Sequence, residues 1–160
     1  MQSISEIEKN PFYKYLTVED VEHLKVVNFL KSDFPDVVAF HVPNSSKKKP
    51  FDLFKHSIMG ILKGICDFII LHPKYKTIFE NDKPKKILVY HGLAIELKAP
   101  EHNVIIKKGK NEGKIRKAIG KLSPEQKEII EKLNKVRYKA VCCFGSDEAI
   151  KVIKEYLLIQ

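Results

Sequence analysis

The segments ICDFIIL at residues 65–71 and HGLAIELK at residues 91–98 decide the fold that this chain can adopt. The first has the length and composition of a buried strand and is too short to cross a membrane. The second alternates between apolar and polar residues, which places Glu96 and Lys98 on one face of a strand, about 7 Å apart. Asp67 lies in the middle of the first segment, where an ionised carboxylate costs free energy unless it is paired or bound to a metal. If the two strands are neighbours, Asp67 and Glu96 can therefore converge on one cation beside Lys98.

These three side chains form a pattern typical of metal-dependent phosphodiester hydrolysis. Carboxylates supply the hard oxygen ligands of Mg²⁺, and a bound metal lowers the pKa of a water molecule and neutralises charge on the phosphate. Lys98 could orient that water or stabilise negative charge in the transition state. Glu19, in the first predicted helix, could complete the coordination of the metal or hold a metal-bound water.

Each candidate residue also has a purely structural interpretation. Asp67 could accept hydrogen bonds from backbone amides at a strand end, and Glu96 and Lys98 could form a surface ion pair on an edge strand. Glu19 could interact favourably with a helix dipole. Gln126 could serve only in the capping box of a helix. The sequence leaves these alternatives open.

Composition limits the classes of function. A chain of 160 residues with 44% hydrophobic residues suits one compact domain. Its net charge of +9, from 29 basic and 20 acidic residues, favours either solubility alone or a polyanionic partner. Nucleic acid is favoured over a membrane surface, because the basic residues cluster along the chain and no segment is both strongly amphipathic and basic.

Several kinds of protein and site are disfavoured. The chain has no apolar leader and no apolar run of about 18 residues, so we expect no membrane association and a cytoplasmic location. Three cysteines, two of them adjacent, predict reduced and mostly buried thiols. No P-loop, GxGxxG or zinc-ligand spacing is present, so we expect no small-molecule cofactor.

The periodicity predicts the order α-β-α-β-β-α-β-α, an α/β domain with a small mixed sheet. The predicted helices cover residues 17–31, with Thr17 as N-cap and an apolar stripe of Val21, Leu24, Val27 and Leu30, then 50–62, 123–136 and a final stretch from Ser146. The predicted strands cover residues 37–42, 65–71, 87–98 and 138–144. Residues 72–86 are predicted to form a polar, basic connection or a hairpin.

Residues 99–121 are predicted to be the least regular part of the chain. This segment contains Glu101 and Glu112 as its only acids against seven basic residues: Lys107, Lys108, Lys110, Lys114, Arg116, Lys117 and Lys121. It could be a solvated loop or a mobile basic flap that contacts phosphates.

Taken together, these residues resemble the motifs of the VRR-NUC (virus-type replication-repair nuclease) branch of the PD-(D/E)xK nucleases, in its stand-alone phage or bacterial form. The resemblance covers about residues 17–158. Its matching pieces, in order, are Glu19 with His23, HVPN at residues 41–44 followed by Lys47–Lys49, GICD at 64–67, HGLAIELK at 91–98, LSPEQ at 122–126 and GSDEA at 145–149. The departures are Cys66 in place of the motif's Pro, His23 in place of the usual Gln, and a longer segment 99–121. Glu22, one turn from Glu19, is an alternative for the acid of the first helix.

The resemblance implies a restriction-endonuclease-like (PD-(D/E)xK) α/β core, with a small mixed sheet flanked by helices. It implies a single nuclease domain over residues 1–160, with its core at about 17–158 and a flexible basic segment at 99–121. The expected activity is that of a Mg²⁺- or Mn²⁺-dependent DNA endonuclease that acts as a homodimer in a bacterial cell or a phage-infected host. The expected substrate is branched or duplex DNA, with selectivity for Holliday-junction or flap-like structures formed in replication, repair or recombination. The alternative is a non-catalytic nucleic-acid-binding module on a nuclease scaffold.

The site residues implied by the resemblance fall into three sets. The catalytic set is Asp67, Glu96, Lys98, Glu19 and Gln126. The metal ligands are Asp67, Glu96, the backbone carbonyl of Leu97, and Glu19. The residues expected to contact nucleic acid are Asn44, Lys47, Lys48, Lys49, Lys107, Lys108, Lys110, Lys114 and Arg116.

Overall fold

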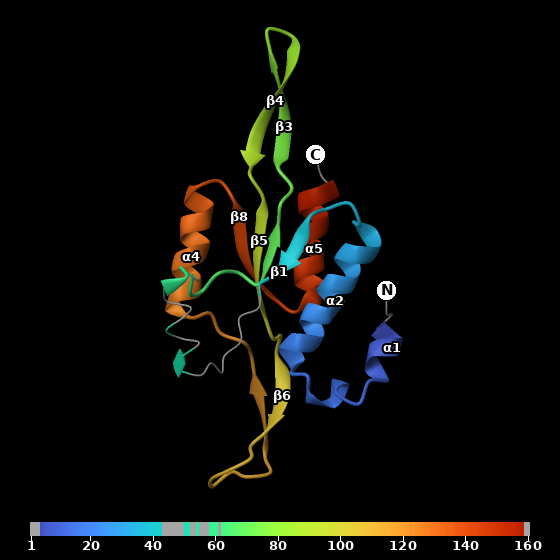
Figure 1. The fold of residues 1–160 in the computed structure, drawn as a ribbon, viewed down its shortest axis with the longest axis vertical. Coiled ribbons are helices and arrows are strands. Elements are labelled where there is room, and N and C mark those ends of the chain that lie inside the picture. Colours follow the sequence, from blue (N-terminus) through green and yellow to red (C-terminus); the bar gives the residue numbers. More distant parts are fainter. Residues whose placement is uncertain (1–3, 43–49, 52–53, 55–57, 61, 159–160) are drawn as a thin grey trace. The chain divides into compact units, whose positions relative to one another are not determined.

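The computed structural model describes residues 4–42, 50–51, 54, 58–60 and 62–158 (Figure 1). These residues form two compact units. The first unit comprises the described residues up to Val37, Leu97–Leu122, and the described residues from Cys142 onward. The second comprises the described residues of Val38–Glu96 together with Ser123–Val141. None of the described helices is long and apolar enough to span a bilayer.

The described elements confirm the predicted α/β fold with small sheets and flanking helices. The helices are α1 (Ile4–Glu8), the 3₁₀ helix η1 (Tyr13–Tyr15), α2 (Val18–Asp33), α4 (Pro124–Lys135) and α5 (Ser146–Leu158). The strands are β1 (Ala39–His41), β2 (Phe68–Ile70), β3 (Lys74–Glu80), β4 (Lys83–Tyr90), β5 (Leu93–Lys98), β6 (His102–Ile105), β7 (Ile115–Ala118) and β8 (Lys139–Phe144). A four-stranded sheet has the order β1-β2-β5-β8, and β3–β4 and β6–β7 form two-stranded sheets.

In the second unit, β2 pairs antiparallel with both β1 and β5. Strand β5 is buried along its whole length, as expected for a central strand that is covered on both faces. Helix α4 contributes Ile130 and Leu133 to a small apolar cluster around Cys66, Ala94 and Ala140. This cluster fixes the helix against β2 and β5, and its burial of apolar surface stabilises the unit.

In the first unit, α2 packs against α5. Helix α2 begins with a capping box in which Thr17 and Asp20 exchange hydrogen bonds, as the predicted N-cap requires. Its buried residues are Glu22, Val26 and Leu30, so the predicted stripe is correct only at Leu30. The buried face is shifted because Glu22 turns toward the start of α5, where its carboxylate accepts a hydrogen bond from the Ser146 N–H at 2.5 Å.

Two predicted segments differ from the structure, and a third decides between two predicted alternatives. Residues 87–98 are not one strand, because strand structure is interrupted at His91–Gly92, between β4 and β5. A side chain at Gly92 would place its Cβ 2.8 Å from the Ile70 carbonyl oxygen and 2.9 Å from the Tyr138 ring, so only glycine fits this approach. Residues 72–86 contain β3 and part of β4, the predicted hairpin alternative. Residues 99–121 contain the antiparallel β6–β7 hairpin and are therefore more regular than predicted.

Candidate active site

The two carboxylates of the candidate site come from β5, which carries Glu96, and from Asp67, the residue directly before its antiparallel neighbour β2. The register pairs Phe68 of β2 with Ile95 of β5, and continuing it by one residue sets Asp67 opposite Glu96. Directly opposed residues of an antiparallel pair have Cβ atoms about 4.5–5.5 Å apart. Asp67 is 5% exposed and Glu96 is 0% exposed. The predicted pairing of these strands is therefore present, and both acids are buried; that they share a cation stays a prediction.

Gln126 holds Glu96 from the first turn of α4. Its side-chain Nε2 donates a hydrogen bond to Oε1 of Glu96. Its Oε1 accepts a hydrogen bond from the Ser123 N–H at 2.8 Å, and Ser123 Oγ accepts one from the Gln126 N–H at 3.2 Å. The capping interpretation of Gln126 is therefore correct, and the other end of the same side chain binds Glu96; its catalytic role stays a prediction.

The turn that leads into Asp67 is fixed by backbone contacts. Gly64 has φ +76°, and a Cβ there would lie 2.7 Å from the carbonyl carbon of Glu125 and 2.8 Å from the Gln126 nitrogen. This close approach of the turn to the start of α4 requires glycine. On the other side, the Asp67 carbonyl oxygen accepts a hydrogen bond from the Val42 N–H at 2.8 Å. The turn is therefore held to α4 at one end and to the residue after β1 at the other.

His41 is a further support that the sequence argument did not assign. Its Nδ1 lies 3.0 Å from the same Asp67 carbonyl oxygen, and its ring packs against that of Phe68 with a centroid distance of 5.5 Å. The only signal in the sequence was its place in the HVPN motif. Its partner, 26 residues further along the chain, becomes visible only once β1 and β2 are paired.

In the first unit, Glu19 binds the backbone at the end of β5, next to Lys98 in the sequence. Oε2 of Glu19 accepts a hydrogen bond from the Ala99 N–H at 3.2 Å. Lys98 is 8% exposed, and its carbonyl oxygen accepts a hydrogen bond from the Gly145 N–H at 2.9 Å. A Cβ at Gly120 would come within 2.8 Å of the Lys98 Cβ, so this glycine allows the chain after β7 to pass close to the lysine. Because a strand alternates its side chains, Lys98 lies on the same side of β5 as Glu96.

Glu22 has a structural partner of its own, which distinguishes it from Glu19. Its carboxylate binds the Ser146 N–H and the Lys25 ammonium, which lies 2.7 Å from Oε1. Burial opposes ionisation of Glu22, but the hydrogen bonds from Lys25 and Ser146 outweigh it and lower the pKa of the carboxyl below its ordinary value. Of the two candidate acids, Glu19 and Glu22, Glu19 is therefore the one that contacts the chain at the end of β5, through the Ala99 N–H.

The predicted nucleic-acid contacts are described only in part. The five residues of the β6–β7 hairpin in this set are all exposed: Lys107, Lys108, Lys110, Lys114 and Arg116. Within the hairpin, Lys114 donates a hydrogen bond to the Asn111 side chain at 3.1 Å. Asn44 and Lys47–Lys49 lie outside the described residues. A basic hairpin with exposed side chains is able to contact a phosphate backbone.

The donor set suits a hard divalent cation. Across the parts of the chain that the structure describes, no group of three or more His, Cys, Asp or Glu side chains is placed to hold a metal. Mg²⁺ is commonly bound by only one or two carboxylates and keeps several water ligands, and Mn²⁺ also prefers oxygen donors. In the second unit, Asp67 and Glu96 supply such donors and no thiolate or imidazole, so these two residues fit Mg²⁺ or Mn²⁺ and do not fit structural zinc.

Comparison with known proteins gives one informative match. No family model matches the chain, and no curated protein does either. A solved structure described as "VRR_NUC domain protein" is 26% identical to the chain, covers 89% of each chain and has a TM-score of 0.58. This match supports the assignment of the chain to the VRR-NUC family. The VRR-NUC resemblance and the α/β nuclease fold predicted from the sequence are thus confirmed, and the chain has a nuclease-type domain.

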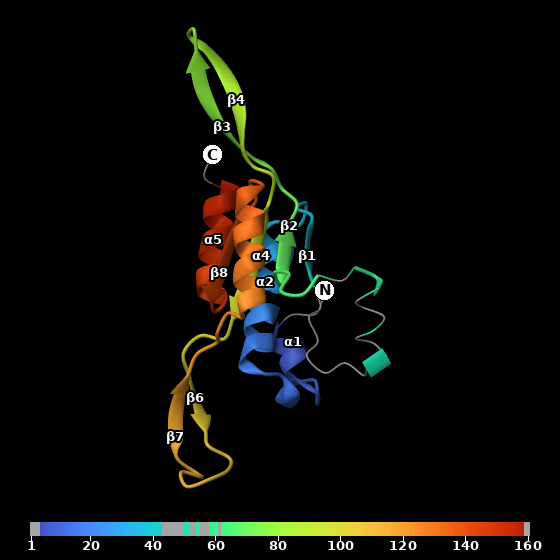
Figure 2. The same ribbon diagram turned by 90° about the vertical axis from the view of Figure 1, so that its left-hand side faces the viewer.

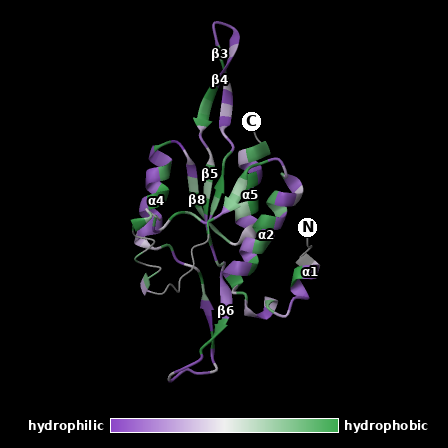
Figure 3. Cartoon of the chain, viewed as in Figure 1, coloured by the Kyte–Doolittle hydropathy of each residue, from purple (hydrophilic) through white to green (hydrophobic). Residues whose placement is uncertain are grey.

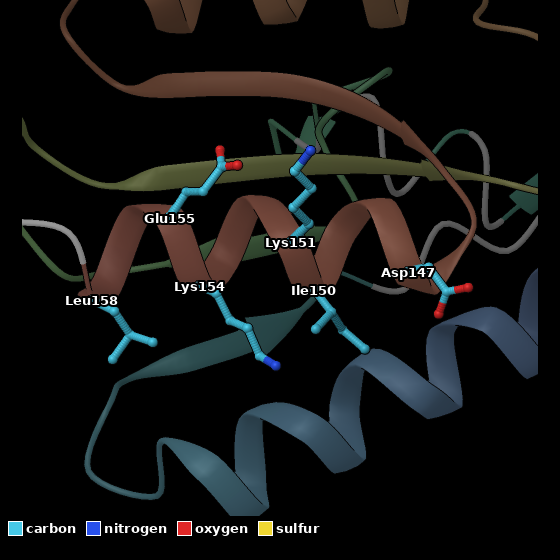
Figure 4. Close-up of a pocket in the computed structure, with 6 residues that line it drawn as sticks. All are labelled: Asp147, Ile150, Lys151, Lys154, Glu155 and Leu158. Atoms are coloured by element: carbon cyan, nitrogen blue, oxygen red, sulfur yellow. The ribbon is translucent and has the colours of Figure 1, made fainter.

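The structure also has a pocket on α5. Six side chains of this helix line it: Asp147, Ile150, Lys151, Lys154, Glu155 and Leu158 (Figure 4). The Lys154 ammonium lies 5.2 Å from the ring centroid of Phe29 on α2. This contact and the apolar members of the lining are typical of helix packing, and none of the predicted site residues takes part.

Proposed function

We propose that this chain is a Mg²⁺- or Mn²⁺-dependent DNA endonuclease. The observation that supports the proposal is the antiparallel pairing of β2 with β5, together with the burial of Asp67 directly before β2 and of Glu96 on β5, where Gln126 binds it. Two buried acids at opposed positions repel each other and lose hydration, so their common burial favours a shared cation. The similarity to a VRR_NUC domain protein supports the proposal that these residues belong to a nuclease.

The residues of the chain would divide the work of phosphodiester hydrolysis. When bound, the metal supplies a water of lowered pKa and neutralises charge on the phosphate. Asp67, Glu96 and the Leu97 carbonyl would hold the metal, and Gln126 would keep the Glu96 carboxylate in one orientation. The Lys98 ammonium would orient the attacking water or stabilise the negative charge that develops on the phosphate. Glu19 would assist from the end of β5, where it binds the Ala99 N–H.

The proposed substrate is branched or duplex DNA of the Holliday-junction or flap-like kind, processed in replication, repair or recombination in the bacterial cytoplasm. The exposed lysines of the β6–β7 hairpin support a phosphate-rich substrate, because each phosphate contact releases counterions and adds affinity. We further propose a homodimer, because two symmetric cuts need two sites related by a two-fold axis.

A cleavage panel tests this function. Purified protein is incubated with single-stranded, duplex, flap and four-way DNA in the presence of Mg²⁺ or Mn²⁺. Asp67→Asn and Glu96→Gln should abolish cleavage while DNA binding and the circular dichroism spectrum are retained. Glu131→Gln, which makes the same charge change at an exposed residue of α4, should cleave like the wild type.

Two outcomes would decide against the enzyme. If the wild type cuts no DNA or RNA substrate with either metal, the proposal is wrong. If titration calorimetry also gives no Mn²⁺ heat while DNA binding is tight and salt-dependent, the chain is a non-catalytic binding module on a nuclease scaffold.

A further inference from the structure

The β3–β4 hairpin is a separate two-stranded ribbon in the second unit (Figures 1 and 2). Its strands are joined by Asn81 and Asp82, which have φ values of 51° and 59°. Positive φ at both central residues is the signature of a type I′ turn, whose twist matches that of a two-stranded ribbon. Among the described strands, β3 and β4 pair only with each other. The two strands therefore form an arm that does not contribute a strand to the four-stranded sheet.

The ribbon carries an excess of exposed basic side chains. Residues 74–90 contain five lysines and two acids, and Figure 3 shows much of this arm as hydrophilic. One ion pair is present, in which Lys85 Nζ lies 2.6 Å from Glu80 Oε2. For Lys76, Lys83 and Lys86, the described part of the chain provides no ion pair, and all three are exposed. The arm thus has an excess of positive charge that its own acids do not neutralise.

One face of the ribbon carries exposed aromatic rings beside Lys86, whereas Lys76 and Lys83 lie on the opposite face. The register pairs Thr77 with Lys86 and Phe79 with Pro84, so these four side chains share one face. Phe79 is 75% exposed and Tyr75, on the same face, is 47% exposed. Lysines on an exposed strand pair can serve only to prevent edge-to-edge pairing. That role does not require large aromatic side chains in water, so the face favours a partner.

Charge and dimensions select the partner. A lysine-rich arm is complementary to a polyanion and repels a second copy of itself. Two paired strands lie about 4.8 Å apart, and the seven residues of β3 extend about 23 Å. The major groove of B-DNA, about 12 Å wide, admits a two-stranded ribbon. An exposed phenylalanine at the tip of such a ribbon can contact base edges, including the methyl group of thymine.

We propose that the β3–β4 ribbon binds in the major groove of a duplex arm of the substrate. The face of Phe79 and Lys86 turns toward the base edges, which Phe79 contacts, and the long side chains of Lys76 and Lys83 on the outer face, with that of Lys86, contact phosphates that border the groove. The inference rests on the proposed function only in taking DNA as the substrate. It assigns to this ribbon a role in binding that is separate from cleavage.

Salt dependence tests the lysines. Affinity for a blunt DNA duplex is measured in EDTA, where cleavage does not interfere, for the wild type and for a variant that combines Lys76→Ala, Lys83→Ala and Lys86→Ala. Each phosphate contact contributes about 0.9 to the slope of log affinity against log salt, so the slope should fall by about 2.7. Between about 50 and 200 mM salt, the wild type should then lose about 40-fold more affinity than the variant.

A matched control separates contact from overall charge. The same change at three exposed lysines outside both hairpins, Lys9, Lys31 and Lys127, should leave the slope as in the wild type. Equal slopes for the ribbon variant and the wild type would overturn the inference and leave the lysines as edge protection. If the ribbon variant shows the reduced slope while no substrate is cleaved by the wild type, the nuclease proposal fails and the ribbon inference stands.

Phe79→Ser tests the groove face. We expect at least a fivefold loss of affinity for duplex DNA, no change for a single strand of the same sequence, and an unchanged salt slope. An equal loss on both forms would mean stacking on unpaired bases and would contradict groove binding. A change from dimer to monomer in sedimentation would instead show that the ribbon binds a second copy, and the inference would be wrong. A thermal melt like that of the wild type establishes that the variant is folded.

Discussion

Replacing Gln126 by Ala removes two interactions that one side chain makes at once. The lost capping interaction with Ser123, 2.8 Å long in the structure, is worth about 0.5–2 kcal/mol. The lost hydrogen bond to the fully buried Glu96 is worth about 1.5–3 kcal/mol, because hydrogen bonds to charged groups are stronger than neutral ones. The expected loss in the free energy of unfolding is therefore about 2–5 kcal/mol. For a chain of this length, each kcal/mol lowers the melting temperature by about 2–4 °C.

Ser123→Ala is the matched control, because it removes a cap partner and leaves the Gln126–Glu96 hydrogen bond possible. It should cost about 1 kcal/mol in urea unfolding. In a double-mutant cycle, Gln126→Ala should cost no more than this control once Glu96→Ala is already present. If Gln126→Ala and Ser123→Ala are equally destabilising in the otherwise wild-type chain, Gln126 only caps the helix, and its hydrogen bond to Glu96 does not contribute to the free energy of unfolding. Cleavage should fall with Gln126→Ala and not with Ser123→Ala.

Three further predictions concern the supports of the site. Gly64→Ala should destabilise the chain and reduce cleavage, because the added Cβ would meet the backbone of α4. Gly60 is the control: its φ is +71°, but an added Cβ would have no atom within 4 Å, so Gly60→Ala should cost only the backbone strain, about 1–3 kcal/mol. The pKa of Glu22 lies below its ordinary 4.5, so the stability that Glu22 adds is complete above that pH and is lost as the pH falls. In Glu22→Gln, the free energy of unfolding in urea should therefore fall less between pH 7 and about pH 3 than in the wild type. An unchanged pH profile would contradict this. Cys66→Ser should lower the melting temperature by placing a hydroxyl in an apolar cluster, yet leave the metal dependence of cleavage unchanged.

The sequence predicted those features that depend on local pattern. The alternation around Glu96 and the apolar run around Asp67 were sufficient to predict two buried strands with acids on them. The cap at Thr17 was equally local and was correct. The alternatives for Gln126 could not be decided, because its second hydrogen bond goes to a residue 30 positions away. A periodicity argument contains no information about such a partner.

The misplaced segments have the same origin. Residues 87–98 show an almost continuous apolar pattern, and the break at Gly92 follows from the Ile70 carbonyl and the Tyr138 ring, which belong to distant segments. The β6–β7 hairpin was hidden because lysines dominate residues 99–121 and strand formers are fewer. Its pairing joins Val104 to Arg116 and Ile105 to Ile115, a pattern that appears only after the chain has turned back on itself.

Cys66 stands where the motif that the chain resembles has Pro, and the backbone contacts on either side of position 66 explain this difference. A proline before Asp67 would stiffen the backbone, and its absence suggests a looser aspartate. In this chain, Gly64 seats the turn against α4, and the Asp67 carbonyl is held by the Val42 N–H, with His41 Nδ1 3.0 Å away. These contacts act on both sides of position 66, so the residue there is left to pack in the apolar cluster. A small, soft side chain such as Cys suits that role better than a polar one. The turn before Asp67 is therefore fixed through backbone contacts, although one residue differs from the motif that the chain resembles.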